Sequence, residues 1–352
     1  MDTKQLKTLA TAAVRKTPLT FSLNGKTETF TTDAVNETLR NEMNELTSSY
    51  AAFRRNQNTI FELIEETIDE VLPAKVEQQY EMFAETRTLA QGDKAIFTLK
   101  TTEAARTRAK QFVTRVGLAG RYETFMLDGT QLEVTVSAIG GAARIGFEEF
   151  LDGRIEFSEL TSILLEGMDE FIYTEVAKAL DAAYEEVPTN NVVSTNKFDE
   201  KAMDRLLSIS DSYYGGNSII VCTNEFAGTM VPTNGTGIDY SAFTDGMKEQ
   251  LWSTGRLGAY KGHTVVILRQ SMVDATNKEK VIDPSNAYIL PSGNTRPVKI
   301  AFEGPTHVRT VEDNDDWSRD LQTYKKFGVA VMTNPAMCKY TNTSLTKEVN
   351  PD

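Results

Sequence analysis

The longest regular pattern of hydrophobic positions lies near the middle of the chain, between Ser158 and Pro188. Apolar residues recur there at spacings of three to five, which places them on one face of an α-helix: Leu160, Leu164, Met168, Phe171, Val176, Leu180, Ala183 and Val187. Ser158 suits the N-cap position, and Pro188 prevents the helix from continuing. We therefore predict a spine helix over residues 158–187, about 44 Å long.

The region before residue 74 predicts a hairpin followed by two helices. In the stretch FSLNGKTETF, the pair Asn24-Gly25 is typical of a tight turn between two short strands. From Asp33 onward, amphipathic spacing predicts one helix that reaches Phe53 and a second that includes Ile60 and Leu72. We expect the second helix to end at Pro73, because proline disrupts a helix interior.

Strand patterns dominate between residues 74 and 153. One strand is predicted around Lys94–Lys100, and the alternation over residues 131–136 predicts another. For residues 101–120, periodicity does not decide between a short basic helix and the tip of a long two-stranded loop. The segment 141–154 is predicted as a further strand that leads into the spine helix.

Helices and strands alternate after Pro188. Helices are predicted over residues 198–213 and 241–254, with a short one that Asn224 could cap. Strands are predicted over 218–223, 263–270, 287–293, 298–304 and 307–313, with a closing strand pair within 321–340. With no internal repeat, the whole pattern indicates an α+β protein.

Composition adds limits on function. The 352 residues include 50 acidic and 37 basic side chains, for a net charge of −13, which disfavours tight binding to DNA or RNA. No apolar run is long enough for a membrane span or a secretory signal. Cys222 and Cys338 are too few for a disulfide framework, so we expect a protein of a reducing compartment.

The charge is distributed unevenly along the chain. Residues 94–121, here called the basic segment, contain a single acid, Glu103, and carry +6, which leaves −19 for the remainder. The basic side chains are Lys94, Lys100, Arg106, Arg108, Lys110, Arg115 and Arg121. One interpretation is a solvated basic face. The other is that the segment contacts an acidic surface on another copy of the chain, because complementary charge directs association.

Candidate catalytic chemistry is sparse. His263 and His307 could shuttle protons near neutral pH, but each lies in an apolar strand pattern that indicates a structural role. Gly140-Gly141 follows a strand without the Lys-Ser/Thr of a phosphate loop, and no HExxH or GxSxG pattern occurs. Cys222 is predicted to be inert packing. We predict no enzyme activity and no catalytic, cofactor-binding or metal site.

The order of these predicted parts along the chain resembles that of a known protein family. An N-terminal arm, a charged hairpin-like excursion, strands with a spine helix, an α/β lobe and the closing YKKFGVAVMTNPAM follow one another. From about residue 74 to 340, this resembles the Hong Kong 97-type major capsid protein of tailed double-stranded DNA bacteriophages. The implied domains are an N-terminal arm with helices (1–73), an extended loop region (74–130), a peripheral domain (131–195 and 292–352) holding the spine helix, and an axial domain (196–291).

The resemblance also implies a function. A protein of this type assembles into hexamers and pentamers of an icosahedral head shell, which encloses phage DNA without sequence-specific binding. The implied partners are other copies of the chain, together with scaffolding, portal and decoration proteins; no cofactor and no membrane are implied. The implied location is the virion, with assembly in the host bacterial cytoplasm. All seven basic side chains of the basic segment then become candidates for intersubunit contact.

Two alternatives remain open from the sequence. An encapsulin-like nanocompartment shell would share the fold, although residues 1–72 exceed the N-terminal region usual in that class. An acidic cytosolic α+β enzyme would instead be a monomer or small oligomer with a deep pocket near Cys222 or His263.

Overall fold

The computed structural model describes residues 3–23, 26–98, 131–145, 157–214, 218–231, 243–291, 296–312 and 319–349. The helices in these ranges are α1 (Thr3–Arg15), α2 (Thr32–Leu46), α3 (Tyr50–Tyr80), α6 (Phe157–Ala183), α7 (Glu200–Tyr214), α8 (Asn224–Thr229) and α9 (Asp245–Thr254). The first strands are β1 (Leu19–Leu23), β2 (Lys26–Phe30), β3 (Ala84–Leu89), β4 (Ala95–Thr98), β5 (Gln131–Val134) and β6 (Ser137–Ile145). The others are β7 (Val192–Thr195), β8 (Ser218–Thr223), β9 (Ala259–Tyr260), β10 (His263–Leu268), β11 (Asn286–Pro291), β12 (Val298–Glu312), β13 (Arg319–Val331) and β14 (Cys338–Asn342).

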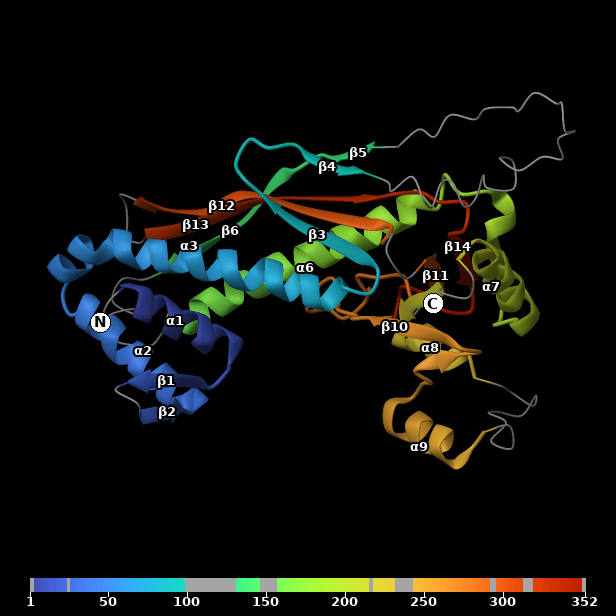
Figure 1. Cartoon of the computed structure of the whole chain (residues 1–352), viewed down its shortest axis with the longest axis horizontal. Helices are drawn as coiled ribbons and strands as arrows, with labels where there is room; N and C mark the ends of the chain where they lie inside the picture. Colours follow the sequence, from blue (N-terminus) through green and yellow to red (C-terminus); the bar gives the residue numbers. More distant parts are fainter. Residues whose placement is uncertain are drawn as a thin grey trace, which may run out of the picture.

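The strands form two larger sheets and two ribbons. A four-stranded sheet has the order β3-β12-β13-β6, and a six-stranded sheet has the order β7-β14-β11-β8-β10-β9. β1–β2 and β4–β5 are separate two-stranded ribbons. Figure 1 shows the four-stranded sheet along one long side of the molecule, with α7, α8 and α9 gathered around the other sheet.

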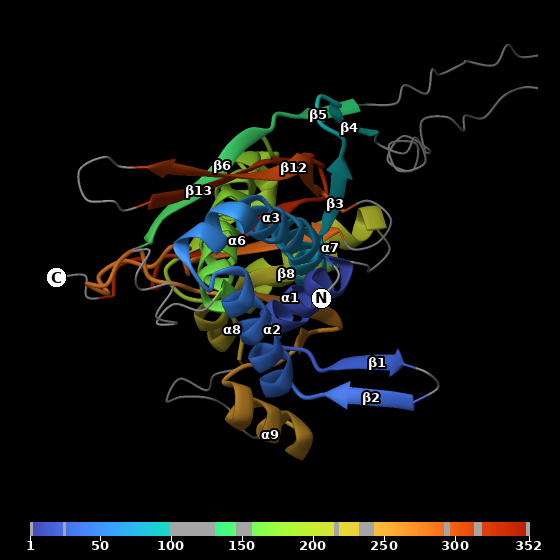
Figure 2. The same cartoon turned by 90° about the vertical axis from the view of Figure 1, so that its left-hand side faces the viewer.

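Two long helices connect these parts. α3 packs against β12 and β3, while α6 packs against β13 and β6 and also contacts α1, α2 and α3. Both helices lie beneath the four-stranded sheet in Figure 1 and Figure 2. Just past the end of α6, the Tyr184 hydroxyl donates to the backbone oxygen of Ile289 at 3.2 Å, which ties the helix to the six-stranded sheet.

The main hydrophobic core lies between these layers. It joins apolar side chains of α1, α2, α3 and α6 to one face of each large sheet, and Ile68, Ile172 and Phe302 are fully buried in it. A second cluster covers the other face of the six-stranded sheet with α7 and α8, around Leu206, Cys222 and Phe226. α6 therefore packs in a core to which both large sheets contribute side chains.

Most predicted elements are present. α6 corresponds to the predicted spine helix but ends at Ala183, and β1 pairs with β2 as the predicted hairpin. The turn residues 24 and 25 lie outside the described residues. The α+β class is confirmed by the mixture of helices with antiparallel and parallel strand pairs.

The expected helix end at Pro73 is wrong. α3 continues through Pro73 to Tyr80. A proline in a helix interior costs about 3 kcal/mol. Val76 and Tyr80, both beyond the proline, are buried in the main core. Each large apolar side chain buried in this way contributes about 1.5–3 kcal/mol, so packing outweighs the lost helix hydrogen bond.

Other boundaries differ from the expectations for similar reasons. The predicted helix from Asp33 to Phe53 is interrupted at Thr47–Ser49, where the Ser49 side chain caps the start of α3. The two strands expected over 298–304 and 307–313 are one long strand, β12, with an irregular register between Glu303 and His307. α1 was not predicted.

The two expected closing strands are present as β13 and β14, but they do not pair with each other. β13 pairs with β12 and β6 in the four-stranded sheet, whereas β14 pairs with β11 and β7 in the six-stranded sheet. The final part of the chain therefore joins the two sheets.

The pair Gly140-Gly141 has a packing role inside β6. A Cβ atom on Gly140 would lie 2.2 Å from the Thr323 backbone oxygen, whereas one on Gly141 would lie 3.6 Å from Leu164 Cδ2. The first distance is a clash with the paired strand β13, and the second is an ordinary contact. Gly140 is therefore required by the close approach of β6 and β13, and not for phosphate binding.

This difference predicts opposite effects for two neighbouring substitutions. Gly140→Ala should lower the free energy of unfolding by about 1–3 kcal/mol, because overpacking forces β6 away from β13. Gly141→Ala should be neutral or stabilise by about 0.4–1 kcal/mol, because it reduces the freedom of the unfolded chain. Denaturant unfolding of the unassembled subunit measures both. Equal effects of the two substitutions would contradict the packing assignment.

Candidate assembly surfaces

The ribbon β4–β5 contains residues 95–98 of the basic segment. The two strands are antiparallel, with Thr98 opposite Gln131 at the open end of the ribbon. Phe97 and Val134 are buried against Ala301 of β12. Figure 1 shows the ribbon above the four-stranded sheet, on the side opposite α3 and α6, and it contacts the two central strands β12 and β13. The base of the segment is thus fixed by apolar packing.

Charged side chains reinforce this base. Arg87 donates to Glu85 at 2.6 and 2.9 Å and lies 4.6 Å above the Phe97 ring. The buried Lys299 on β12 also donates to Glu85. Burial acts to raise the pKa of Glu85, but the hydrogen bonds from Lys299 and Arg87 outweigh it, and the pKa lies below its ordinary value. This carboxylate stays charged and joins β3, β4 and β12.

The turn before β4 is pinned in the same way. The Gly92 backbone N–H donates to Glu303 Oε1 at 3.0 Å, and Lys326 Nζ donates to the same oxygen at 2.7 Å. Gly92 has a φ of 89°, in the region that favours glycine. The turn is therefore held by β12 and β13 together.

A further network attaches α3 to the sheet. Lys325 on β13 is 1% exposed and donates to Asp69 on α3. Asp69 also accepts hydrogen bonds from the Thr306 backbone N–H at 2.9 Å and from its hydroxyl. One turn earlier, Glu65 accepts from the Val308 backbone N–H at 2.6 Å. These contacts fix the N-terminal helices beneath β12 and β13.

These networks were not predicted from sequence. The signal available was the alternation in β13, because Thr323, Lys325 and Phe327 lie on one face of that strand. Thr323 and Phe327 lie on either side of Lys325 on this face, and both are buried. This indicates that the lysine is buried too and needs a carboxylate partner. Which carboxylate supplies it depends on tertiary structure.

Of the seven predicted contact residues, one can be located. Lys94 donates to Glu133 across the β4–β5 ribbon at 2.9 Å, and both side chains are mostly exposed. Such a surface pair contributes little stability. The other six, Lys100, Arg106, Arg108, Lys110, Arg115 and Arg121, lie outside the described residues. Their role as intersubunit contacts stays a prediction.

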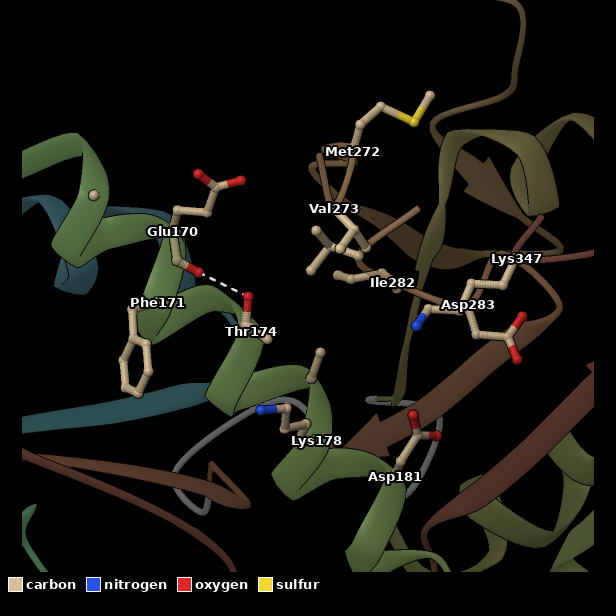
Figure 3. A pocket seen from close by; sticks show the side chains of 13 residues that line it. Glu170, Phe171, Thr174, Lys178, Asp181, Met272, Val273, Ile282, Asp283 and Lys347 are labelled. Atoms are coloured by element: carbon tan, nitrogen blue, oxygen red, sulfur yellow. Dashed lines mark hydrogen bonds between the residues drawn. The ribbon is translucent and has the colours of Figure 1, made fainter. Parts of the chain in front are cut away.

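An open groove runs along the exposed side of α6. It has a volume of about 710 Å³ and lies between α6 and the segment 272–283, with Lys347 beside it. Figure 3 shows Asp181 of α6 and Asp283 of the facing segment in this groove, with Met272 and Val273 above. Phe171 and Val273 are half exposed. Mixed apolar and charged walls suit contact with a protein surface more than chemistry on a small molecule.

Ser218, His263 and Asp211 form one cluster of polar side chains. Ser218 Oγ lies 3.0 Å from His263 Nδ1 and donates to Asp211 Oδ1 at 2.9 Å, while His263 Nε2 lies 3.3 Å from Asp211 Oδ2. Ser218 is 3% exposed, so its hydroxyl is not available to a substrate. This cluster joins α7, β8 and β10. The predicted structural role of His263 agrees with this geometry, and the His307 ring packs on Tyr324.

Both thiols of the chain are buried. Burial raises the pKa of both the Cys222 and the Cys338 thiol to about 12, so neither is a thiolate near neutral pH. Within the described part of the chain, no group of histidine, cysteine and acidic side chains could hold a metal ion. In the same residues, no helix combines the length and apolar character needed to cross a bilayer.

Comparisons with known proteins are consistent with one another. The family described as "SPbeta prophage-derived putative capsid protein YonB" matches residues 5–341. The capsid of a native GTA particle matches with a TM-score of 0.53 and 13% identity, over 75% of this chain and 89% of that chain. A phage-related protein from Bordetella bronchiseptica RB50 matches with a TM-score of 0.51 and 14% identity, over 81% and 97%. No curated protein matches the sequence.

Proposed function

We propose how this chain, which belongs to the YonB family of prophage-derived capsid proteins and has the Hong Kong 97-type fold, builds a shell. It is a structural capsid component of a virion. We infer that its copies form the hexamers and pentamers of an icosahedral head, which encloses double-stranded DNA. The prophage family favours this role over an encapsulin-like compartment.

The observation that carries this proposal is the base of the basic segment. Apolar packing, the Glu85 network and the pinned turn fix the ribbon β4–β5 to the four-stranded sheet. A rigid base allows the residues beyond it to be placed accurately on another molecule, because less freedom is lost on binding. The segment carries +6 and the remainder of the chain −19, so another copy of the same chain offers the complementary charge.

We further propose that the basic side chains themselves make the contact between copies. They are Lys94, Lys100, Arg106, Arg108, Lys110, Arg115 and Arg121. Lys94 is paired with Glu133 at the base of the ribbon, which suits it to orienting the segment.

The division into domains is proposed with one change. We propose that the four-stranded sheet with α6 forms the peripheral domain and that the six-stranded sheet with α7, α8 and α9 forms the axial domain; the two sheets are separate in strand order. β7 and β14 pair within the six-stranded sheet, so we assign both strands to the axial domain.

The acidic charge suits a container for nucleic acid. A chain of net charge −13 repels the phosphate backbone, which keeps the enclosed DNA free of tight binding to the wall. Assembly in the host bacterial cytoplasm, and partnership with scaffolding, portal and decoration proteins, follow from the same proposal.

Purified protein tests this proposal directly. We expect light scattering and electron microscopy to detect particles of tens of nanometres, or sheets and tubes, that form as the subunit concentration rises. A monomer that stays dispersed at high concentration, with and without a co-expressed scaffolding protein, would contradict a shell function and favour the acidic enzyme.

A further inference from the structure

α9 forms a small, rigid projection of the six-stranded region. The helix ends at Gly255, which has a φ of 74° and donates its backbone N–H to the Leu251 oxygen at 2.8 Å. Leu251 is buried with Val231 and Phe243 in a small cluster separate from the two main cores. In Figure 1 and Figure 2, α9 lies at the end of the molecule away from the four-stranded sheet. Its orientation is fixed by its own anchor.

Trp252 follows this anchor and points the other way. Its side chain is 87% exposed, more than any other large hydrophobic side chain in the described ranges. Tryptophan is mostly buried in folded proteins, and it is enriched among the residues that dominate binding energy at interfaces. A tryptophan on a capped helix is already ordered before binding, which lowers the entropy cost of using it.

The charges around Trp252 are balanced. Residues 243–258 contain two acids and two bases, so their net charge is zero in a chain of −13. Lys248 pairs with Asp245 at 3.1 Å. Glu249 on α9 is exposed and Arg256 just after the helix is half-buried, and neither has an ion pair within the residues that the structure describes. The exposed Trp252 side chain thus belongs to a short segment that also carries two opposite charges without an ion pair in the described residues.

We propose that α9 is a contact between copies of this chain, with Trp252 at its centre and Glu249 of one copy facing Arg256 of the next. Identical acidic subunits repel one another over most of their surface, and a neutral patch is where they can approach closely. A patch with both signs of charge is complementary to itself when rotational symmetry brings copies together. This inference rests on the proposed function and specifies one surface for it.

The burial of Trp252 can be measured directly, because the chain contains only one other tryptophan, Trp317. In the variant Trp317→Phe, the fluorescence comes from Trp252 alone. We expect acrylamide to quench it several-fold less in assembled particles than in dissociated subunits, with emission at a shorter wavelength. If the variant does not assemble, the difference between the wild-type protein and Trp252→Phe supplies the same comparison.

Substitutions test the contact independently. Trp252→Ala should raise the subunit concentration needed for assembly by roughly tenfold or more. Ser253→Ala, on the next residue of the same helix, is the matched control and should leave that concentration unchanged. Glu249→Arg and Arg256→Glu should each weaken assembly, and their combination should restore it. A folded Trp252→Ala subunit that assembles like wild type would overturn the inference.

The outcomes separate this inference from the proposed function. Particles in which Trp252 is as accessible as in the free subunit would overturn the α9 contact alone. Protection of Trp252 that requires a second, different protein would also overturn a contact between copies. A wild-type chain that forms no particle would overturn the proposed function, and the contact with it.

Discussion

Asp69→Ala is expected to lower the free energy of unfolding of the unassembled subunit by about 3–5 kcal/mol, because it leaves a buried charge without its partner. Lys325 is 1% exposed, and Asp69 is the carboxylate to which it donates. The substitution also removes the acceptor of the Thr306 backbone N–H. Water cannot replace these partners for a lysine so deeply buried.

Two further variants make this prediction specific. Glu70→Ala removes a carboxylate one residue later on the same helix, where Glu70 lies 3.6 Å from Arg15 and both side chains are well exposed. That change should cost less than about 1 kcal/mol. The double variant Asp69→Ala with Lys325→Met should recover much of the loss, because no buried charge remains. Denaturant unfolding measures all of them, and equal losses for Asp69→Ala and Glu70→Ala would contradict the assignment.

The triple variant Arg106→Glu, Arg108→Glu and Lys110→Glu is expected to abolish shell assembly while the subunit remains folded. The substitutions change the net charge of the basic segment from +6 to zero. A neutral segment loses its attraction to an acidic neighbour, and like charges brought together at an interface cost several kcal/mol. Light scattering reports assembly, and circular dichroism with denaturant unfolding reports the fold.

An equal change of charge elsewhere is the matched control. Lys197, Lys201 and Lys278 are exposed, and their replacement by glutamate alters the total charge by the same amount. This control should retain assembly if position, and not overall charge, is decisive. Normal particles from the Arg106, Arg108 and Lys110 variant would contradict the proposed role of the basic segment.

The sequence could predict elements whose pattern is local. The spine helix follows from a helical spacing whose positions α6 mostly buries, with the exception of the half-exposed Phe171. The hairpin β1–β2 follows from a turn signal between two short strands. The buried strand β8 is a continuous apolar run, which is why its place was predictable. In each case, the information lies within a few neighbouring residues.

The sequence could not predict features that depend on distant parts of the chain. α3 passes through Pro73 because Val76 and Tyr80 have a core to enter, and that core is supplied by α6 and the sheets. The candidate site shows the same limit: Lys325 finds Asp69 across 256 positions of sequence. The charge of the basic segment was visible from composition, but the network of Glu85, Arg87 and Lys299 at its base was not.

A reconstruction of assembled particles by electron microscopy tests the central claim most directly. The claim is that each subunit is completed by its neighbours through the segment that leaves the β4–β5 ribbon. The account predicts density for residues 99–130 of one copy against the surface of another. Density that places these residues on the body of their own subunit, in particles or in a stable monomer, would contradict it.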